Sequence, residues 1–140
     1  MVYTRRDVRR TLSIGVGVTI LLTLAGALFL PALALAALGF IGVVVAAAVV
    51  LARGTSRWAY VWAAAITGAL WLAATVAYWA LWSAAFDFAD ANKAVPASIQ
   101  SASNTALIAG VVAFVALIVI TLTIHLRSGT LPKAPVPQAA

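Results

Sequence analysis

A single histidine is the residue in this chain best suited to chemistry, because imidazole can act as a base or bind a metal near neutral pH. His125 has the hydroxyls of Thr121 and Thr123 within about one helical turn, but no carboxylate stands nearby to orient it. Hydrolysis needs a nucleophile, a base and an orienting group, and a metal needs several ligands. The chain also has no cysteine. We therefore expect His125 to be structural, and we predict no catalytic residue, no metal site and no cofactor.

Ion transport would need a different set of residues, namely ionisable side chains inside the membrane that bind the ion or relay the proton. The three aspartates and the nine lysines and arginines all lie outside the long apolar stretches. Small multidrug antiporters have a similar length but rely on a buried carboxylate in their first helix. The matching stretch here offers only the hydroxyls of Ser13, Thr19 and Thr23. We do not expect an autonomous ion pump or antiporter.

The composition points to a lipid environment. Of 140 residues, 65% are hydrophobic and 9% are charged, and the mean hydropathy is +1.11. The net charge of +6 comes from basic residues that flank apolar runs. Such a pattern suits a membrane surface, whereas nucleic-acid binding would need a basic face with interleaved polar or aromatic groups. We expect the lipid bilayer as a partner, with bound lipids as an option, and no nucleic acid.

The apolar stretch from Leu12 to Ala52 decides how many times the chain crosses the membrane. As one helix it would be roughly 60 Å long, which is about twice the thickness of a bilayer core. Pro31 lies near its middle, and proline fits the first turn of a new helix. We therefore predict an all-α integral membrane four-helix bundle made of two helical hairpins. Its spans cover about residues 12–30, 32–52, 58–84 and 105–126.

The basic residues provide a test of this count, since lysine and arginine near membrane spans stay preferentially in the cytoplasm. With four spans, eight of the nine basic residues share one side and Lys93 alone lies opposite. A single crossing between Leu12 and Ala52 would divide them five against four, with no signal for orientation. We predict four spans with the N and C termini both cytoplasmic.

The N-terminal region also resembles a secretion signal. Arg9-Arg10-Thr11-Leu12 resembles a twin-arginine motif, and Ala32-Leu33-Ala34 or Ala34-Leu35-Ala36 resembles a signal-peptidase site. Alanine-rich helices match such sites by chance, and the apolar run continues past them into a second span. We expect the segment to be retained.

Two polar segments lie outside the spans. Residues 86–104 contain Pro96, which is placed to open a helix, and we expect them to lie outside the cytoplasm, either as a solvated connector or as a short interfacial helix that faces a partner. The tail from Ser128 to Ala140 contains three prolines and is expected to be extended, as a linker or a short docking strand.

The third span has two different faces. Four small residues recur at intervals of four and are expected to pack against another helix, because small side chains let helices approach closely in lipid; they are Ala65, Ala69, Ala73 and Ala77. Aromatic residues lie on the roughly opposite face, where Trp71 sits near mid-depth. We predict that this face contacts a partner protein, with lipid as the alternative, through Trp71, Tyr78 and Trp82. Small pairs in the other spans are expected to pack within the bundle: Ser13 with Gly17, Gly42 with Ala46, and Ala106 with Gly110.

The heavy use of alanine and valine, the preference for arginine over lysine and the stretch from Trp71 to Trp79 resemble proteins of actinobacteria. At the level of span number and composition, the chain resembles the small four-helix accessory subunits of actinobacterial, mycobacterial-type inner-membrane complexes, such as the lipid-importing transporters of the mammalian-cell-entry type. The resemblance implies a multi-pass protein of the bacterial inner membrane that binds other membrane subunits and is not an enzyme. It implies a non-catalytic accessory or assembly subunit, with a lipid or hydrophobic-substrate transporter favoured. The alternatives are an accessory subunit of a respiratory supercomplex, a self-assembling carrier for a neutral or lipidic substrate, and a scaffold or regulator that binds through its tail.

Overall fold

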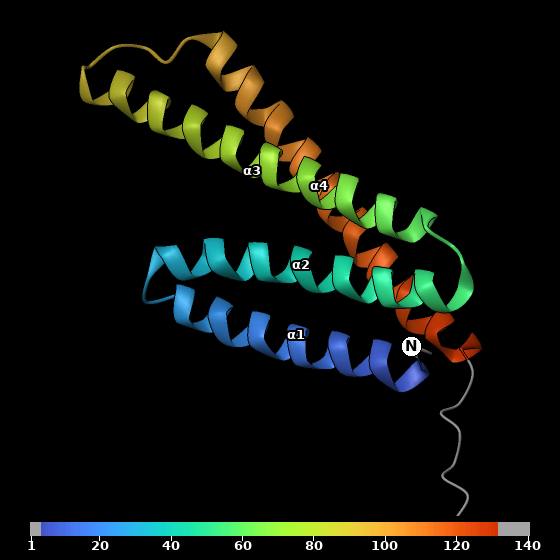
Figure 1. Cartoon of the computed structure of the whole chain (residues 1–140). Coiled ribbons are helices and arrows are strands. Elements are labelled where there is room, and N and C mark those ends of the chain that lie inside the picture. Colours follow the sequence, from blue (N-terminus) through green and yellow to red (C-terminus); the bar gives the residue numbers. More distant parts are fainter. Residues whose placement is uncertain (1–3, 132–140) are drawn as a thin grey trace, which may run out of the picture. The chain divides into compact units, whose positions relative to one another are not determined.

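The computed structural model describes residues 4–131, and every regular element in that range is helical (Figure 1). The elements are α1 (Arg5–Gly26), α2 (Leu30–Thr55), α3 (Ala59–Asp90), α4 (Ala97–Arg127) and a short 3-10 helix, η1 (Ser128–Thr130). The predicted all-α class with four long helices is confirmed. The proline-rich tail beyond Leu131, including Lys133, lies outside the described residues.

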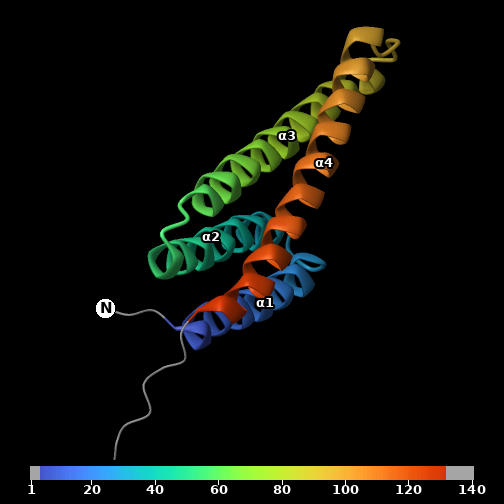
Figure 2. The same ribbon diagram turned by 90° about the vertical axis from the view of Figure 1, so that its right-hand side faces the viewer.

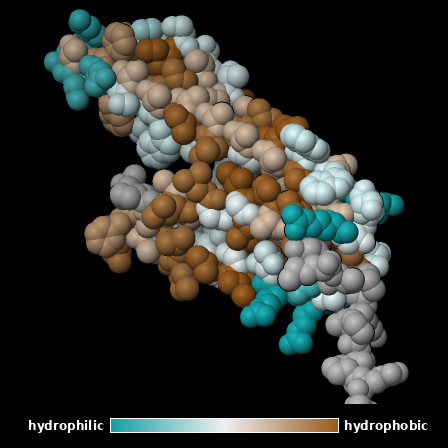
Figure 3. Space-filling model, viewed as in Figure 1, coloured by the Kyte–Doolittle hydropathy of each residue, from teal (hydrophilic) through white to brown (hydrophobic). Residues whose placement is uncertain are grey.

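All four helices are long and apolar enough to cross a membrane, over Arg5–Gly26, Ala32–Thr55, Ala59–Asp90 and Ala97–Thr130. Large apolar side chains cover much of the face seen in Figure 3, and hydrophilic side chains gather near helix ends. Leu21 is 67% exposed and Ile108 is 64% exposed, although neither lies in the first or last turn of its helix. Exposed apolar area of this extent is typical of helices surrounded by lipid.

The chain forms two compact units, one of residues 1–65 with 118–140 and the other of Ile66–Leu117. In the first unit α1 and α2 lie side by side as a hairpin (Figures 1 and 2). The turn between them occupies Ala27 to Phe29, and Pro31 is the second residue of α2. The first helix therefore ends at Gly26, four residues before the expected boundary, because the new helix forms its first turn around the proline.

Two glycines of α1 allow this hairpin to close tightly. A Cβ atom at Gly15 would overlap the side chain of Val43, and one at Gly26 would overlap Leu33. By contrast, a Cβ atom at Gly17 or at Gly42 would have no neighbouring atom within 4 Å. Gly17 and Gly42 therefore do not lie at the α1–α2 contact, and in α1 the close approach falls two residues before Gly17, at Gly15.

In the first unit, the start of α1, the end of α2 and the segment that follows α4 lie close together. The Asp7 carboxylate accepts hydrogen bonds from the Thr4 backbone N–H at 2.6 Å and from the Thr4 hydroxyl at 3.0 Å, which caps α1. The Arg5 guanidinium donates to the carbonyl oxygen of Gly129 in η1. Leu131 is buried and lies close to Gly54 at the end of α2. These contacts fasten the end of α4 to the α1–α2 hairpin.

In the second unit, residues of α3 and α4 pack as an antiparallel pair joined by a short connection over residues 91–96. The chain leaves α3 through Asn92, which adopts a left-handed conformation with φ of 52°. The Lys93 N–H donates to the Phe88 carbonyl at 2.9 Å, and the Asn92 N–H donates to the Ala89 carbonyl at 2.9 Å. These two hydrogen bonds form the pattern that commonly terminates a helix when the residue after it adopts the left-handed conformation. Asparagine tolerates this conformation better than most residues do.

Most of the polar segment 86–104 is helical, and the connection itself occupies only residues 91–96. The α3 helix has 32 residues and continues to Asp90, and α4 begins directly after Pro96. A helix of that length is roughly 48 Å long, whereas a bilayer core is about 30 Å thick. Alanines at 84, 85, 89, 97 and 102 support helix beyond the apolar core, because alanine is the best helix former.

Candidate functional site: two grooves along α3 and α4

The contact between α3 and α4 in the second unit is made by small residues. A Cβ atom at Gly110 would stand 3.5 Å from the Cβ of Ala74, which is ordinary van der Waals contact. Ala106, one turn before Gly110, lies on the same seam and borders the grooves on both of its sides. Such residues let helix backbones approach closely. The expected packing pair Ala106–Gly110 therefore lies at the helix contact, opposite Ala74.

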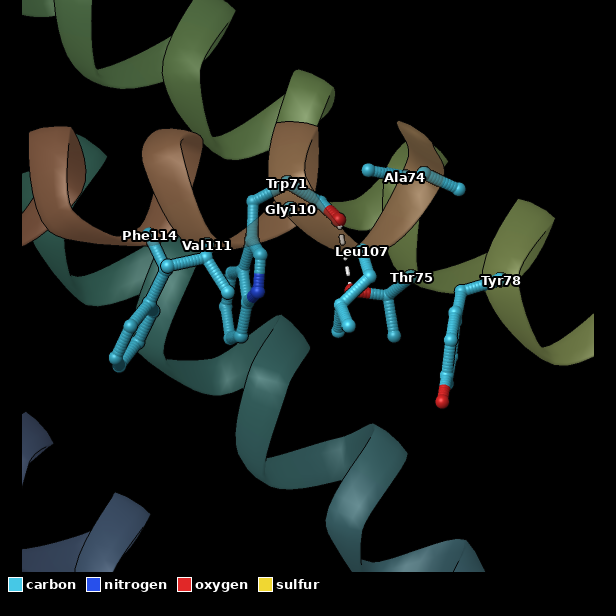
Figure 4. A pocket seen from close by; sticks show the side chains of 9 residues that line it. Trp71, Ala74, Thr75, Tyr78, Leu107, Gly110, Val111 and Phe114 are labelled. Carbon is cyan, nitrogen blue, oxygen red and sulfur yellow. Dashed lines mark hydrogen bonds between the residues drawn. The ribbon is translucent and has the colours of Figure 1, made fainter. Parts of the chain in front are cut away.

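An aromatic groove runs along one side of this seam (Figure 4). Its volume is about 260 Å³, and its lining residues are Trp71, Ala74, Thr75, Tyr78, Ala106, Leu107, Gly110, Val111 and Phe114. Trp71 and Phe114 form its end, with ring centroids 5.0 Å apart and planes inclined by 39°. The Trp71 ring thus packs against another helix of its own chain. Only lipid or a partner protein was expected from the sequence as its environment.

The aromatic groove continues into a row of rings on α3. Tyr78 and Trp82 have ring centroids 6.3 Å apart, and Trp82 and Phe86 have centroids 4.9 Å apart with planes at 69°. Both separations fall in the range of favourable aromatic pairs. Trp82 remains 43% exposed and Phe86 remains 53% exposed. The structure therefore brings together the three candidate contact residues Trp71, Tyr78 and Trp82 along one side of α3.

A second, larger groove runs along the other side of the seam and is called the small-residue groove below. Its volume is about 870 Å³. It is lined by Thr67, Leu70, Ala73, Ala74, Ala77 and Leu81 of α3, and by Ser101, Ala102, Thr105, Ala106, Ala109, Val112, Ala113 and Ala116 of α4. Ligand pockets commonly have volumes of roughly 300–1,000 Å³, so this groove has room for an acyl chain or for side chains of another helix.

The alanine stripe of α3 is divided between several environments. Ala73 and Ala77 line the small-residue groove and are exposed in it. Ala69 is exposed, Ala65 is half-buried, and neither lines a groove. The alanine that contacts Gly110 of α4 is Ala74, which is one position away from the stripe, and Ala73 and Ala77 lie in the open groove beside this contact.

Three aliphatic hydroxyl groups that line these grooves donate to carbonyl oxygens of their own helices. Thr75 donates to the Trp71 carbonyl at 2.8 Å (Figure 4), and Thr105 donates to the Ser101 carbonyl at 2.9 Å. Ser101 in turn donates to the Ser98 carbonyl at 3.1 Å. A hydroxyl that already donates to a carbonyl four residues earlier is a poor donor to a ligand. Apolar contact is consequently the main interaction that the grooves offer.

His125 lies in the last turn of α4 and is exposed. Its carbonyl oxygen accepts a hydrogen bond of 2.5 Å from the hydroxyl of the buried Ser128, and the Thr123 hydroxyl donates to the Val119 carbonyl at 2.8 Å. Thr123 is therefore not paired with the imidazole as a nucleophile would be. Within residues 4–131, no group of three or more His, Cys, Asp or Glu side chains is placed to hold a metal.

Phe86 of the aromatic row, Phe114 of the aromatic groove and Ala74 of the seam were not foreseen from the sequence. Phe86 continues the spacing of four from Tyr78 and Trp82, so that periodicity could have identified it. Phe114 and Ala74 carried no such signal, because their positions depend on how α4 is rotated against α3. Comparison of the chain with models of known protein families, with curated protein sequences and with solved structures gives no match.

Proposed function

We propose that this chain is a non-catalytic accessory or assembly subunit of a larger complex in the bacterial inner membrane, and that the complex transports lipids or other hydrophobic substrates. The observation that carries the proposal is the pair of apolar grooves beside the seam of α3 and α4, which offer surface for contact but few polar groups for chemistry. The proposed partners are other membrane subunits. The resemblance to accessory subunits of lipid importers supports the choice of complex.

The proposal assigns different roles to the two grooves. A transmembrane helix of a partner subunit would lie in the small-residue groove, where Ala73 and Ala77 permit close backbone approach. The aromatic row would provide a second contact on the other side of the seam, since large rings with two rotatable bonds provide much contact area at low entropic cost. Trp71 would then act partly through Phe114, which holds the indole in place.

The proposed orientation puts both chain ends in the cytoplasm. Arginines 5, 6, 9 and 10 belong to the first turns of α1, Arg53 lies in the last turn of α2, and Arg57 follows the end of α2. Because the two helices are antiparallel neighbours, these six residues share one end of the hairpin, and the contact of Arg5 with Gly129 brings the end of α4 to the same end. This clustering supports a cytoplasmic location under the positive-inside rule.

A carrier that assembles with copies of itself is the second candidate function. The volume of the small-residue groove favours it, because about 870 Å³ of apolar space could hold a lipidic substrate without any buried charge. Such a carrier would form a homo-oligomer and would move its substrate in liposomes without any other protein.

Extraction of the tagged full-length chain from its native membrane in a mild detergent distinguishes the candidates. The accessory-subunit proposal predicts different chains in fixed stoichiometry with it. Substitution Trp71→Ala should reduce their recovery about 30-fold if the indole is worth about 2 kcal/mol at the interface. Trp62→Ala is the matched control, since Trp62 is 66% exposed on α3 and lines neither groove.

Each other outcome has a defined meaning. A chain that emerges alone and monomeric contradicts the subunit proposal, and a homo-oligomer that transports alone supports the carrier. Unchanged recovery of every companion with Trp71→Ala contradicts the role of the aromatic groove.

A further inference from the structure

A polar pocket lies at the arginine-rich end of the first unit, and we call it the basic pocket. Its volume is about 320 Å³, and its lining residues are Leu51, Thr55, Arg57, Tyr60, Arg127 and Thr130. They come from three parts of the chain: the end of α2, the connection into the first turn of α3, and the end of α4 with η1. Two guanidinium groups and a phenol thus converge from segments that are far apart in sequence.

The hydrogen-bonding capacity of the basic pocket is that of a donor site. The Thr55 hydroxyl donates to the Leu51 carbonyl at 2.9 Å, and the Thr130 hydroxyl donates to the Arg127 carbonyl at 2.7 Å. The donors that remain for a ligand are the guanidinium groups of Arg57 and Arg127 and the hydroxyl of Tyr60. A ligand that accepts several hydrogen bonds, such as an anion, matches this set.

Among residues 4–131, no acidic side chain neutralises the two arginines. None of the lining residues is acidic, and in the part of the chain that the structure describes no carboxylate forms an ion pair with Arg57 or Arg127. Asp7 is engaged with Thr4, and the other two aspartates lie at the far end of α3 from Tyr60. The pocket therefore concentrates positive charge without an internal counter-ion.

We propose that the basic pocket binds the phosphate group of an anionic phospholipid. Guanidinium groups present paired N–H donors that fit phosphate oxygens bidentately, and basic pockets between membrane helices on the cytoplasmic side hold phospholipid head groups. The volume suits a head group rather than a whole lipid.

Exposed apolar residues that are the sequence neighbours of the two pocket arginines favour a lipid over free phosphate. Trp58 follows Arg57 and is 50% exposed, and Leu126 precedes Arg127 and is 74% exposed. Tryptophan is enriched at the level of lipid head groups. Acyl chains attached to the bound phosphate would contact these side chains, whereas free phosphate would gain nothing from them.

The test uses the full-length chain in nanodiscs that contain equal amounts of phosphatidylglycerol and phosphatidylcholine, with bound lipids counted by native mass spectrometry. Wild-type protein should retain phosphatidylglycerol in preference to phosphatidylcholine. Arg57→Gln with Arg127→Gln should weaken that retention roughly 10- to 30-fold, from the contribution of two basic residues near a membrane. Tyr60→Phe should weaken it by a smaller factor while keeping the ring and the fold.

Arg9→Gln with Arg10→Gln is the charge-matched control, because both residues are exposed at the same end of the unit and line no part of the basic pocket. This control should retain the lipid like wild type. Equal loss in both double variants would contradict a specific pocket and indicate general surface charge. No preference for phosphatidylglycerol, or unchanged retention in the Arg57, Arg127 double variant, would overturn the proposal.

A competition arm separates the two sources of phosphate. Millimolar inorganic phosphate or glycerol 3-phosphate should leave the bound phosphatidylglycerol in place if its acyl chains contribute to binding. Complete displacement by either soluble anion would contradict the lipid assignment.

Discussion

Gly15 and Gly17 show how much depends on single positions in the uncharged part of α1, from Leu12 to Gly26. Both are glycines of α1 two residues apart, yet a Cβ atom at Gly15 would overlap Val43 and one at Gly17 would meet nothing within 4 Å. The difference comes from the rotation of α1 against α2. Sequence periodicity does not reveal this rotation when nearly every neighbour is apolar.

A paired substitution tests this difference. Gly15→Ala should destabilise the chain by about 1–3 kcal/mol, because the added methyl group overpacks the hairpin contact. Gly17→Ala is the matched control and should leave stability unchanged or raise it by up to about 1 kcal/mol, since alanine favours helix over glycine. Unfolding of both variants in detergent, followed by circular dichroism, measures the two effects. Equal stability of the two variants would contradict the hairpin contact.

At the scale of elements, much of the fold could be predicted from the sequence. Four helices follow from apolar runs of membrane length, and Pro31 correctly required a break in the longest run. The ends of the helices could not be derived from hydropathy, because Asp87, Asp90 and Gln100 are polar and yet lie in helices extended by alanine-rich sequence. Helix propensity, not hydropathy, decides where such helices end.

The faces of α3 could be predicted only in part. Its aromatic row was foreseeable from spacing, and Tyr78, Trp82 and Phe86 follow one another at intervals of four. The helix contact was not, because 33 alanines in one chain provide many equivalent small-residue stripes. Only the packing of α4 selects Ala74 for the seam and leaves Ala73 and Ala77 in a groove.

Filling the small-residue groove provides a test at this scale. Ala77→Leu should reduce recovery of the partner subunits roughly tenfold, corresponding to overpacking by about 1.4 kcal/mol. Ala80→Leu is the control, because Ala80 is exposed on the same helix and lines neither groove. Quantitative co-purification of both variants in mild detergent is the measurement. Equal recovery with Ala77→Leu and with Ala80→Leu would exclude this groove as the docking surface.

At the scale of the whole molecule, two features together describe a membrane protein that acts by contact. Apolar side chains remain exposed along all four helices, and the arginines gather at one end of the first unit. Lipid would cover the exposed apolar side chains, and the charged membrane surface would attract the arginines. The proposed contacts with partner subunits and with anionic phospholipid both depend on four crossings that place the connections on alternating sides.

Because the chain has no cysteine, single cysteines can report the side of each connection directly. The positions are Leu28→Cys between α1 and α2, Ser56→Cys between α2 and α3, and Ala94→Cys between α3 and α4. Cells are treated so that the outer barrier is opened while the inner membrane stays sealed, and a membrane-impermeant maleimide is then added. It should label Leu28→Cys and Ala94→Cys. It should label Ser56→Cys only after the inner membrane is permeabilised. Labelling of Ser56→Cys together with Ala94→Cys in sealed cells, or protection of Leu28→Cys, would contradict four crossings with both chain ends inside.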